Sequence, residues 1–222
     1  MTTYVLLKWA HIVAMVYWLG GEWGVFQTSY HVTNPRLSLE ERRRHLETAY
    51  RIDILARTGI VLLFPLGFHM GAVAYNAHPW GDDIPLVWVI MLSWLALTWA
   101  AFFKRETDLG IRLTRIDESL RYVFIPLLLG VSLWSLLGDG PLTVTWYAAK
   151  VFIYSLLLII GLILRFVMRH WTIIFREIAI QGPTPALEGQ LAREISIARM
   201  LAYVYWIGIG TVAMFGVAKA PW

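Results

Sequence analysis

Six long apolar stretches alternate with short polar segments along the chain. A helix that crosses a membrane needs about 20 consecutive, predominantly apolar residues, and each stretch is near that length. The pattern therefore predicts six spans, at residues 4–28, 54–75, 85–103, 122–137, 144–167 and 197–218. Strong turn signals separate several of them, for example at Asn34-Pro35 and at residues 138–141. We expect an all-α fold, a polytopic transmembrane helical bundle that forms a single domain over residues 1–222.

A charged helix is predicted just before the second span. Ser38 is followed three residues later by Glu41, which is the signature of a capping box at a helix start. The three successive arginines at residues 42–44 make this helix basic, so we expect it at the membrane interface, running into the second span. Asp53 and Arg57, four residues apart, are predicted to form an ion pair where the helix enters that span.

The basic residues are distributed unevenly between the two sides of the predicted bundle. If both termini lie on one side, only Lys8, Lys150 and Lys219 fall there. The other sixteen fall towards the opposite side: Arg36, Arg42, Arg43, Arg44, Arg51, Arg57, Lys104, Arg105, Arg112, Arg115, Arg121, Arg165, Arg169, Arg176, Arg193 and Arg199. Cytoplasmic loops carry the excess of lysine and arginine. We therefore expect a multi-pass protein of the inner (plasma) membrane with both termini on the non-cytoplasmic side, which is periplasmic in a diderm bacterium.

Composition supports a membrane protein and narrows the possible cofactors. The chain is 58% hydrophobic and 15% charged, whereas about 25% of the residues of a soluble domain are charged. It has no cysteine, which excludes disulfides, thiolate metal sites, iron–sulfur clusters and haem attached through cysteine. The basic residues follow from topology, so membrane lipid is an expected partner and nucleic acid is not. The N-terminal run lacks the features of a signal peptide, and we expect a retained first span.

Two histidines are predicted to lie at the same membrane depth. His11 comes seven residues after the first span begins, and His69 comes six residues before the antiparallel second span ends. Ionisable residues at hydrocarbon depth are functional hypotheses by default, and two imidazoles from facing helices can ligate one haem b iron. Gly21 and other small residues would admit a porphyrin between the helices. The alternative is that each histidine hydrogen-bonds a neighbouring group. His78, beyond the second span, is expected at the surface, where it could serve a docking or quinone site.

Two further charged side chains fall within the predicted spans. Glu22 lies eleven residues after His11, on nearly the same helix face and ~16 Å deeper. A carboxylate near mid-bilayer pairs, protonates or handles protons; the alternative is a neutral side chain bonded to Gln27, a tyrosine or a serine. Lys150 is expected at the level of the histidines, where it could bind a haem propionate or a quinone oxygen, or else snorkel to the interface. Glu22 and Lys150 are the candidate catalytic residues.

Short motifs connect the chain to a known group of membrane proteins. The segment from Leu7 to Gly21 carries a His-Ile pair at His11, followed by Trp18 and two glycines, and a later segment ends at Lys150 before an apolar helix. In these motifs the chain resembles the HemJ and CopD-like families of small polytopic membrane proteins, with residues 85–137 as an inserted helix pair. HemJ proteins are haem-b-binding protoporphyrinogen oxidases, and CopD-like proteins are linked to copper uptake. The resemblance implies functional roles for His11 and Lys150, with Trp18 and Gly21 near the cofactor.

These observations favour a membrane-embedded b-type cytochrome that acts as an electron-transfer subunit of an oxidoreductase. His11 and His69 would be the axial ligands of the haem iron, and Glu22 would assist proton movement to a quinone. Electrons would pass between the quinone pool and a periplasmic dehydrogenase or cytochrome c. We expect the chain to be part of a complex or a homo-oligomer rather than a complete enzyme. The alternatives are a HemJ-like protoporphyrinogen oxidase and a CopD-like copper transporter or structural subunit without a redox role.

Overall fold

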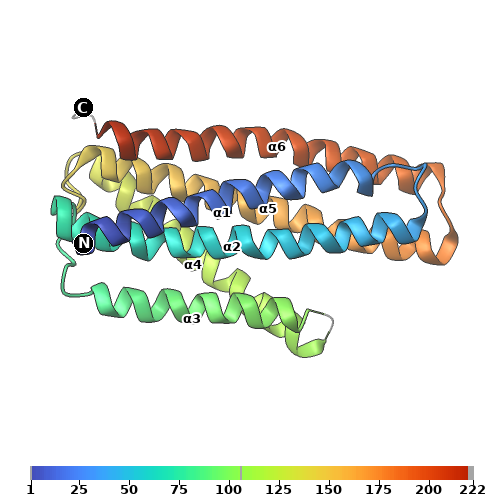
Figure 1. The fold of residues 1–222 in the computed structure, drawn as a ribbon, viewed down its shortest axis with the longest axis horizontal. Coiled ribbons are helices and arrows are strands. Elements are labelled where there is room, and N and C mark those ends of the chain that lie inside the picture. The colour runs from blue at the N-terminus through green and yellow to red at the C-terminus, as the bar shows by residue number, and fades with distance from the viewer. Residues whose placement is uncertain (1, 106, 220–222) are drawn as a thin grey trace.

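The computed structural model describes residues 2–105 and 107–219, and this part of the chain contains six α-helices and no strand (Figure 1). They are α1 (Thr3–Val32), α2 (Leu39–Tyr75), α3 (Ile84–Phe103), α4 (Asp108–Leu136), α5 (Thr145–Gln181) and α6 (Pro185–Ala218). All six are long and apolar enough to cross a membrane. The predicted all-α architecture with six apolar spans is therefore confirmed at the level of the helices.

Three of the helices are much longer than a membrane span. The helices α2 and α5 have 37 residues each and α6 has 34, whereas α3 has 20. At about 1.5 Å per residue, α2 is about 55 Å long and α3 about 30 Å. Figure 1 shows that α1, α2, α5 and α6 continue past the end of α3, on the side away from both termini. We call this side the arginine-rich end and the opposite side the terminal end.

Helix caps set the starts of the long helices at the arginine-rich end. The Glu41 backbone N–H donates to the Ser38 hydroxyl at 3.2 Å, and the Ser38 backbone N–H donates to the Glu41 carboxylate at 2.9 Å. This is the predicted capping box, which is confirmed. At α6 the Thr184 hydroxyl accepts from the Leu187 backbone N–H, and Pro185 occupies the first turn. The predicted charged helix and the second span are one continuous helix.

Small residues bring α1 and α2 close together. A Cβ atom added at Gly59 would lie 2.4 Å from the carbonyl oxygen of Ala14, and one added at Gly21 would lie 2.8 Å from the Cβ of Ala56. Contacts of this kind are typical of helix pairs in membranes, because small residues let the backbones approach. The helix α6 packs on α1 and α5, and the pair α3–α4 packs on α2 and α5.

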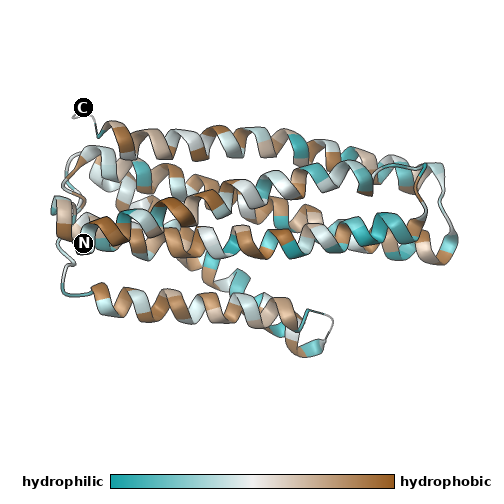
Figure 2. Cartoon of the chain, in the orientation of Figure 1, coloured by the Kyte–Doolittle hydropathy of each residue, from teal (hydrophilic) through white to brown (hydrophobic). Residues whose placement is uncertain are grey.

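The apolar core continues into the arginine-rich end. A cluster of buried residues there joins α1, α2, α5 and α6 and includes Val32, Leu46, Ile174 and Ile195. Figure 2 shows hydrophilic residues gathering on the outside of the same end, most clearly along the first half of α2. The arginine-rich end therefore has the pattern of a water-exposed four-helix bundle, apolar inside and polar outside.

Candidate functional site

A histidine and a lysine lie between the helices near the terminal end, close enough for their charges to interact. The His11 ring on α1 faces α2, where a Cβ atom added at Gly67 would lie 3.3 Å from its Cε1 atom. Within the described part of the chain, His11 Nδ1 is buried and has no hydrogen-bond partner. Lys150 on α5 is the charged neighbour of His11, and its Nζ atom would lie 2.6 Å from a Cβ added at Gly216 on α6. We call these four residues the terminal-end site.

Tyr147 belongs to the same site and was not singled out from the sequence. It lies one turn before Lys150 on α5 and is buried. Its ring fills the space that a side chain at Gly71 would take, with 2.8 Å between the added Cβ and the ring, and its hydroxyl donates to the Gly67 carbonyl at 3.5 Å. Tyr147 thus fixes the side of α2 that His11 and Lys150 approach.

His69 points to a different neighbour. The indole N–H of Trp88 on α3 donates to His69 Nδ1 at 3.4 Å. Gly67 and His69 are two positions apart on α2, which corresponds to about 200° around the helix. Since His11 packs on Gly67, the structure does not bring the two imidazoles together. A shared depth fixes the level of two residues along the bundle, but the direction of each side chain around its helix is set separately.

His78, expected at the surface, is 2% exposed. Its ring stacks on Phe68 with centroids 4.0 Å apart, and its Nε2 lies 3.0 Å from the Phe68 carbonyl oxygen. Burial lowers the pKa of His78 below its ordinary value. This loop histidine therefore closes the terminal end of α2 rather than presenting a docking surface.

The other predicted cofactor contacts, Trp18 and Gly21, lie in helix-packing interfaces. Trp18 is 1% exposed, and its indole N–H donates to the Tyr205 hydroxyl at 3.1 Å. Its ring also meets the Tyr154 and Tyr205 rings edge-on. Gly21 is covered by Ala56. Trp18, Tyr154 and Tyr205 form an aromatic layer across the bundle, between the terminal-end site and the residues described next.

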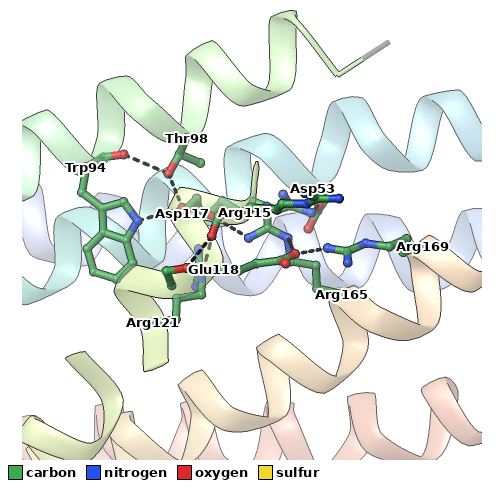
Figure 3. Close-up of polar contacts among 11 residues, drawn as sticks. Asp53, Trp94, Thr98, Arg115, Asp117, Glu118, Arg121, Arg165 and Arg169 are labelled. Carbon is green, nitrogen blue, oxygen red and sulfur yellow. Dashed lines mark hydrogen bonds and ion pairs between the residues drawn. The ribbon is translucent and has the colours of Figure 1, made fainter. Parts of the chain in front are cut away.

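A buried ionic cluster lies beyond the aromatic layer, where α2, α4 and α5 meet (Figure 3). Asp117 on α4 is 0% exposed; it accepts hydrogen bonds from the Trp94 indole at 2.7 Å and the Thr98 hydroxyl at 3.1 Å. It pairs with Arg165 on α5, and Arg121 Nε lies 3.5 Å from its carboxylate. A buried carboxylate needs hydrogen bonds as well as an opposite charge, and this one accepts from Trp94, Thr98 and Arg165 and has Arg121 as a further charged neighbour.

The cluster extends along α4 and α5 and is completed from α2. Glu118 pairs with Arg169 and lies 3.5 Å from Arg165. On α2, Asp53 pairs with Arg57, so the ion pair predicted from their spacing is confirmed. Asp117 and Glu118 were missed from the sequence because the fourth span was predicted to begin at residue 122, whereas α4 begins at Asp108. The four-residue spacing of Asp117 and Arg121 is the signal that marks them.

Glu22 is the one acidic side chain of this region that stays out of the ion pairs among the described residues. It also makes no hydrogen bond there, so the expected bond to Gln27, a tyrosine or a serine is not formed. Its nearest charged neighbours are Asp53 and Arg57. Two cavities of about 40 Å³ each meet at its side chain.

Comparison with models of known protein families, with curated proteins and with solved structures finds no match. Any inference about function therefore rests on two polar sites inside the bundle. They are the terminal-end site around His11 and Lys150, and the buried ionic cluster with Glu22 at its edge. The aromatic layer that contains Trp18 separates them.

Proposed function

We propose that the chain is a membrane-embedded subunit that binds haem b and transfers electrons. The observation that carries the proposal is the buried Nδ1 of His11, which has no hydrogen-bond partner among the described residues and lies within the electrostatic influence of Lys150. A buried ring nitrogen without a partner costs free energy, and neutral imidazole is a common axial ligand of haem iron. A haem iron at this position would give this nitrogen a partner.

The residues of the terminal-end site suit haem in three respects. His11 would be an axial ligand, Lys150 would bind a propionate, and Gly67 and Gly216 place no side chain against either group. When bound, haem would supply one-electron redox chemistry. His69 accepts from Trp88 on another side of α2, so ligation by both histidines would require His69 to leave that contact.

The proposal includes an orientation and a path for the electrons. Sixteen of the nineteen lysines and arginines fall towards the arginine-rich end, which would place that end in the cytoplasm and the terminal-end site near the periplasmic face. There the site would exchange electrons with a periplasmic dehydrogenase or cytochrome c, and with quinone in the bilayer. The proposal includes membership of a complex, in which a partner subunit would supply the electrons or accept them.

A HemJ-like protoporphyrinogen oxidase is the second candidate. One observation favours it: the two residues that the resemblance implies are functional, His11 and Lys150, are neighbours on α1 and α5. This candidate predicts that the isolated protein forms protoporphyrin from protoporphyrinogen with a quinone as acceptor. An electron-transfer subunit would not form that product alone.

A reduced-minus-oxidised visible spectrum of the purified protein, with a pyridine haemochrome assay, tests both candidates. We expect a haem b spectrum in the wild type that is lost in His11→Ala and retained in His45→Ala, a histidine near the arginine-rich end. His69→Ala then separates single-histidine from bis-histidine ligation, since only the second loses its low-spin character. A folded, colourless wild type would refute both candidates and leave the copper or structural alternatives.

A further inference from the structure

The charges of the buried ionic cluster are already balanced without Glu22. Three arginines, Arg57, Arg121 and Arg165, have side chains that are 21%, 7% and 11% exposed, and they face three buried acids, Asp53, Asp117 and Glu118. The fourth arginine, Arg169, reaches the surface, with its side chain 49% exposed. An additional ionised carboxylate would leave the buried cluster with excess negative charge, which is costly away from water. Glu22 is therefore suited to hold a proton and to exchange it.

Glu22 lies where two cavities meet. The first leads towards the ionic cluster and is lined by Arg57, Arg121 and Tyr205, among others. The second leads along α6 towards the arginine-rich end and is lined by Ala198, Arg199 and Ala202, among others. A volume of about 40 Å³ has room for about three or four water molecules, since one needs about 10–15 Å³. Both cavities have the polar groups that hold water.

We propose that Glu22 is a proton-exchange site that is reached through water in the second cavity from the arginine-rich end. A hydronium ion would deliver the proton to the carboxylate, and water would remove it by the same route. The proposal does not depend on haem at His11. It specifies the cavity through which protons reach this carboxylate and the end of the bundle from which they come.

The aromatic layer stops the proton from continuing to the terminal-end site. The Trp18 indole is a donor only, and its N–H is held by Tyr205. The Tyr154 hydroxyl donates to the backbone carbonyl of Ile60 at 2.7 Å, and a carbonyl cannot pass a proton on. Trp18 and Tyr154 therefore offer no hydrogen-bonded path from Glu22 to the terminal-end site.

The charged and titratable groups around Glu22 come from four helices. Asp53 and Arg57 face it from α2, Arg121 from α4, Arg165 from α5, and Tyr205 and Arg199 from α6. Arg199 is held by the Ser29 hydroxyl at 3.0 Å and lies over the Tyr30 ring, 3.8 Å from its centroid. It therefore stands at the far side of the second cavity, and these contacts hold its guanidinium in place.

Infrared spectroscopy of the purified full-length protein in lipid nanodiscs tests the route. The wild type should show the C=O band of a protonated carboxyl that is absent in Glu22→Gln and unchanged in Glu177→Gln, a control acid without an ion pair among the described residues. After transfer to D2O the band should shift at a measurable rate. Ala202→Leu, which fills the second cavity, should slow that shift at least tenfold.

A matched control is Ala96→Leu, which adds the same side chain at an exposed position of α3 and should leave the exchange rate unchanged. If Ala202→Leu does not fold, Ala198→Leu fills the same cavity from one turn away. The proposal is overturned if no protonated carboxyl is lost in Glu22→Gln, or if filling the cavity leaves the rate as it is in Ala96→Leu. The haem spectrum tests His11 and does not require Glu22, so the haem proposal and the proton-exchange proposal can each be refuted without refuting the other.

Discussion

Asp117→Asn is the most informative test of the buried ionic cluster. Asparagine keeps an oxygen that can accept from Trp94 and Thr98, and removes only the negative charge that faces Arg121 and Arg165. Removing one partner of a buried ion pair typically costs about 3–5 kcal/mol, because the remaining charge stays buried without compensation. For a chain of this size we expect the melting temperature to fall by about 6–20 °C.

The assay is thermal unfolding of the purified protein in one detergent, followed by tryptophan fluorescence. The control is Asp82→Asn in the exposed α2–α3 loop, which should change the free energy of unfolding by less than about 0.5 kcal/mol. The double variant Asp117→Asn with Arg121→Gln restores the balance of charge, with Asp53 and Glu118 facing two buried arginines. It should therefore be more stable than Asp117→Asn alone, although it has lost one more side chain. A double variant whose losses simply add would refute the charge-balance reasoning.

Three further predictions concern other parts of the fold. Gly59→Ala places a Cβ 2.4 Å from the Ala14 carbonyl oxygen, so it should destabilise the protein by about 1–3 kcal/mol. Gly20→Ala has open space around the new Cβ and should not destabilise it. Thermal unfolding of the two variants tests this difference. Ser38→Ala removes the capping box and should lower the free energy of unfolding by about 1 kcal/mol. Hydrogen exchange should show faster exchange of the backbone amides in the first turn of α2. Burial lowers the pKa of His78 in the folded state, so below about pH 6.5 the unfolded chain binds a proton at this residue more readily than the folded chain does. The free energy of unfolding should therefore fall as the pH drops below about 6.5. Melting temperatures measured from about pH 5 to 8 should show this fall in the wild type and not in His78→Gln.

The number and type of helices could be predicted because they depend on local signals. Apolar length predicted the six spans, and the spacing of Ser38 and Glu41 predicted the start of α2. The ends of the spans were less accurate, because a hydropathy pattern locates the apolar part of a helix and not its caps. The helix α4 shows the consequence, since it begins at Asp108 and carries charged residues well inside its length.

The candidate site was predictable only in part. His11 and Lys150 could be placed at one level from their positions in the spans, and the structure makes them neighbours. His69 could be placed at that level too, but it points to Trp88 because its direction around α2 depends on how α3 packs. The pairing of Asp117 with Arg165 joins two helices, and no local pattern in either helix specifies the partner.

The pairing of Asp117 with Arg165 also constrains how the chain is made. Arg165 follows Asp117 by 48 residues, so α4 leaves the ribosome before the cation that neutralises it. During that interval the acidic turn of α4 has only the arginines of α4 itself nearby in sequence, Arg112, Arg115 and Arg121, and a buried acid without a full set of partners is disfavoured in lipid. We therefore expect α4 to remain at the membrane surface until α5 has been synthesised, and the two helices to insert together. A chain whose synthesis stalls between the two helices would leave Asp117 without Arg165.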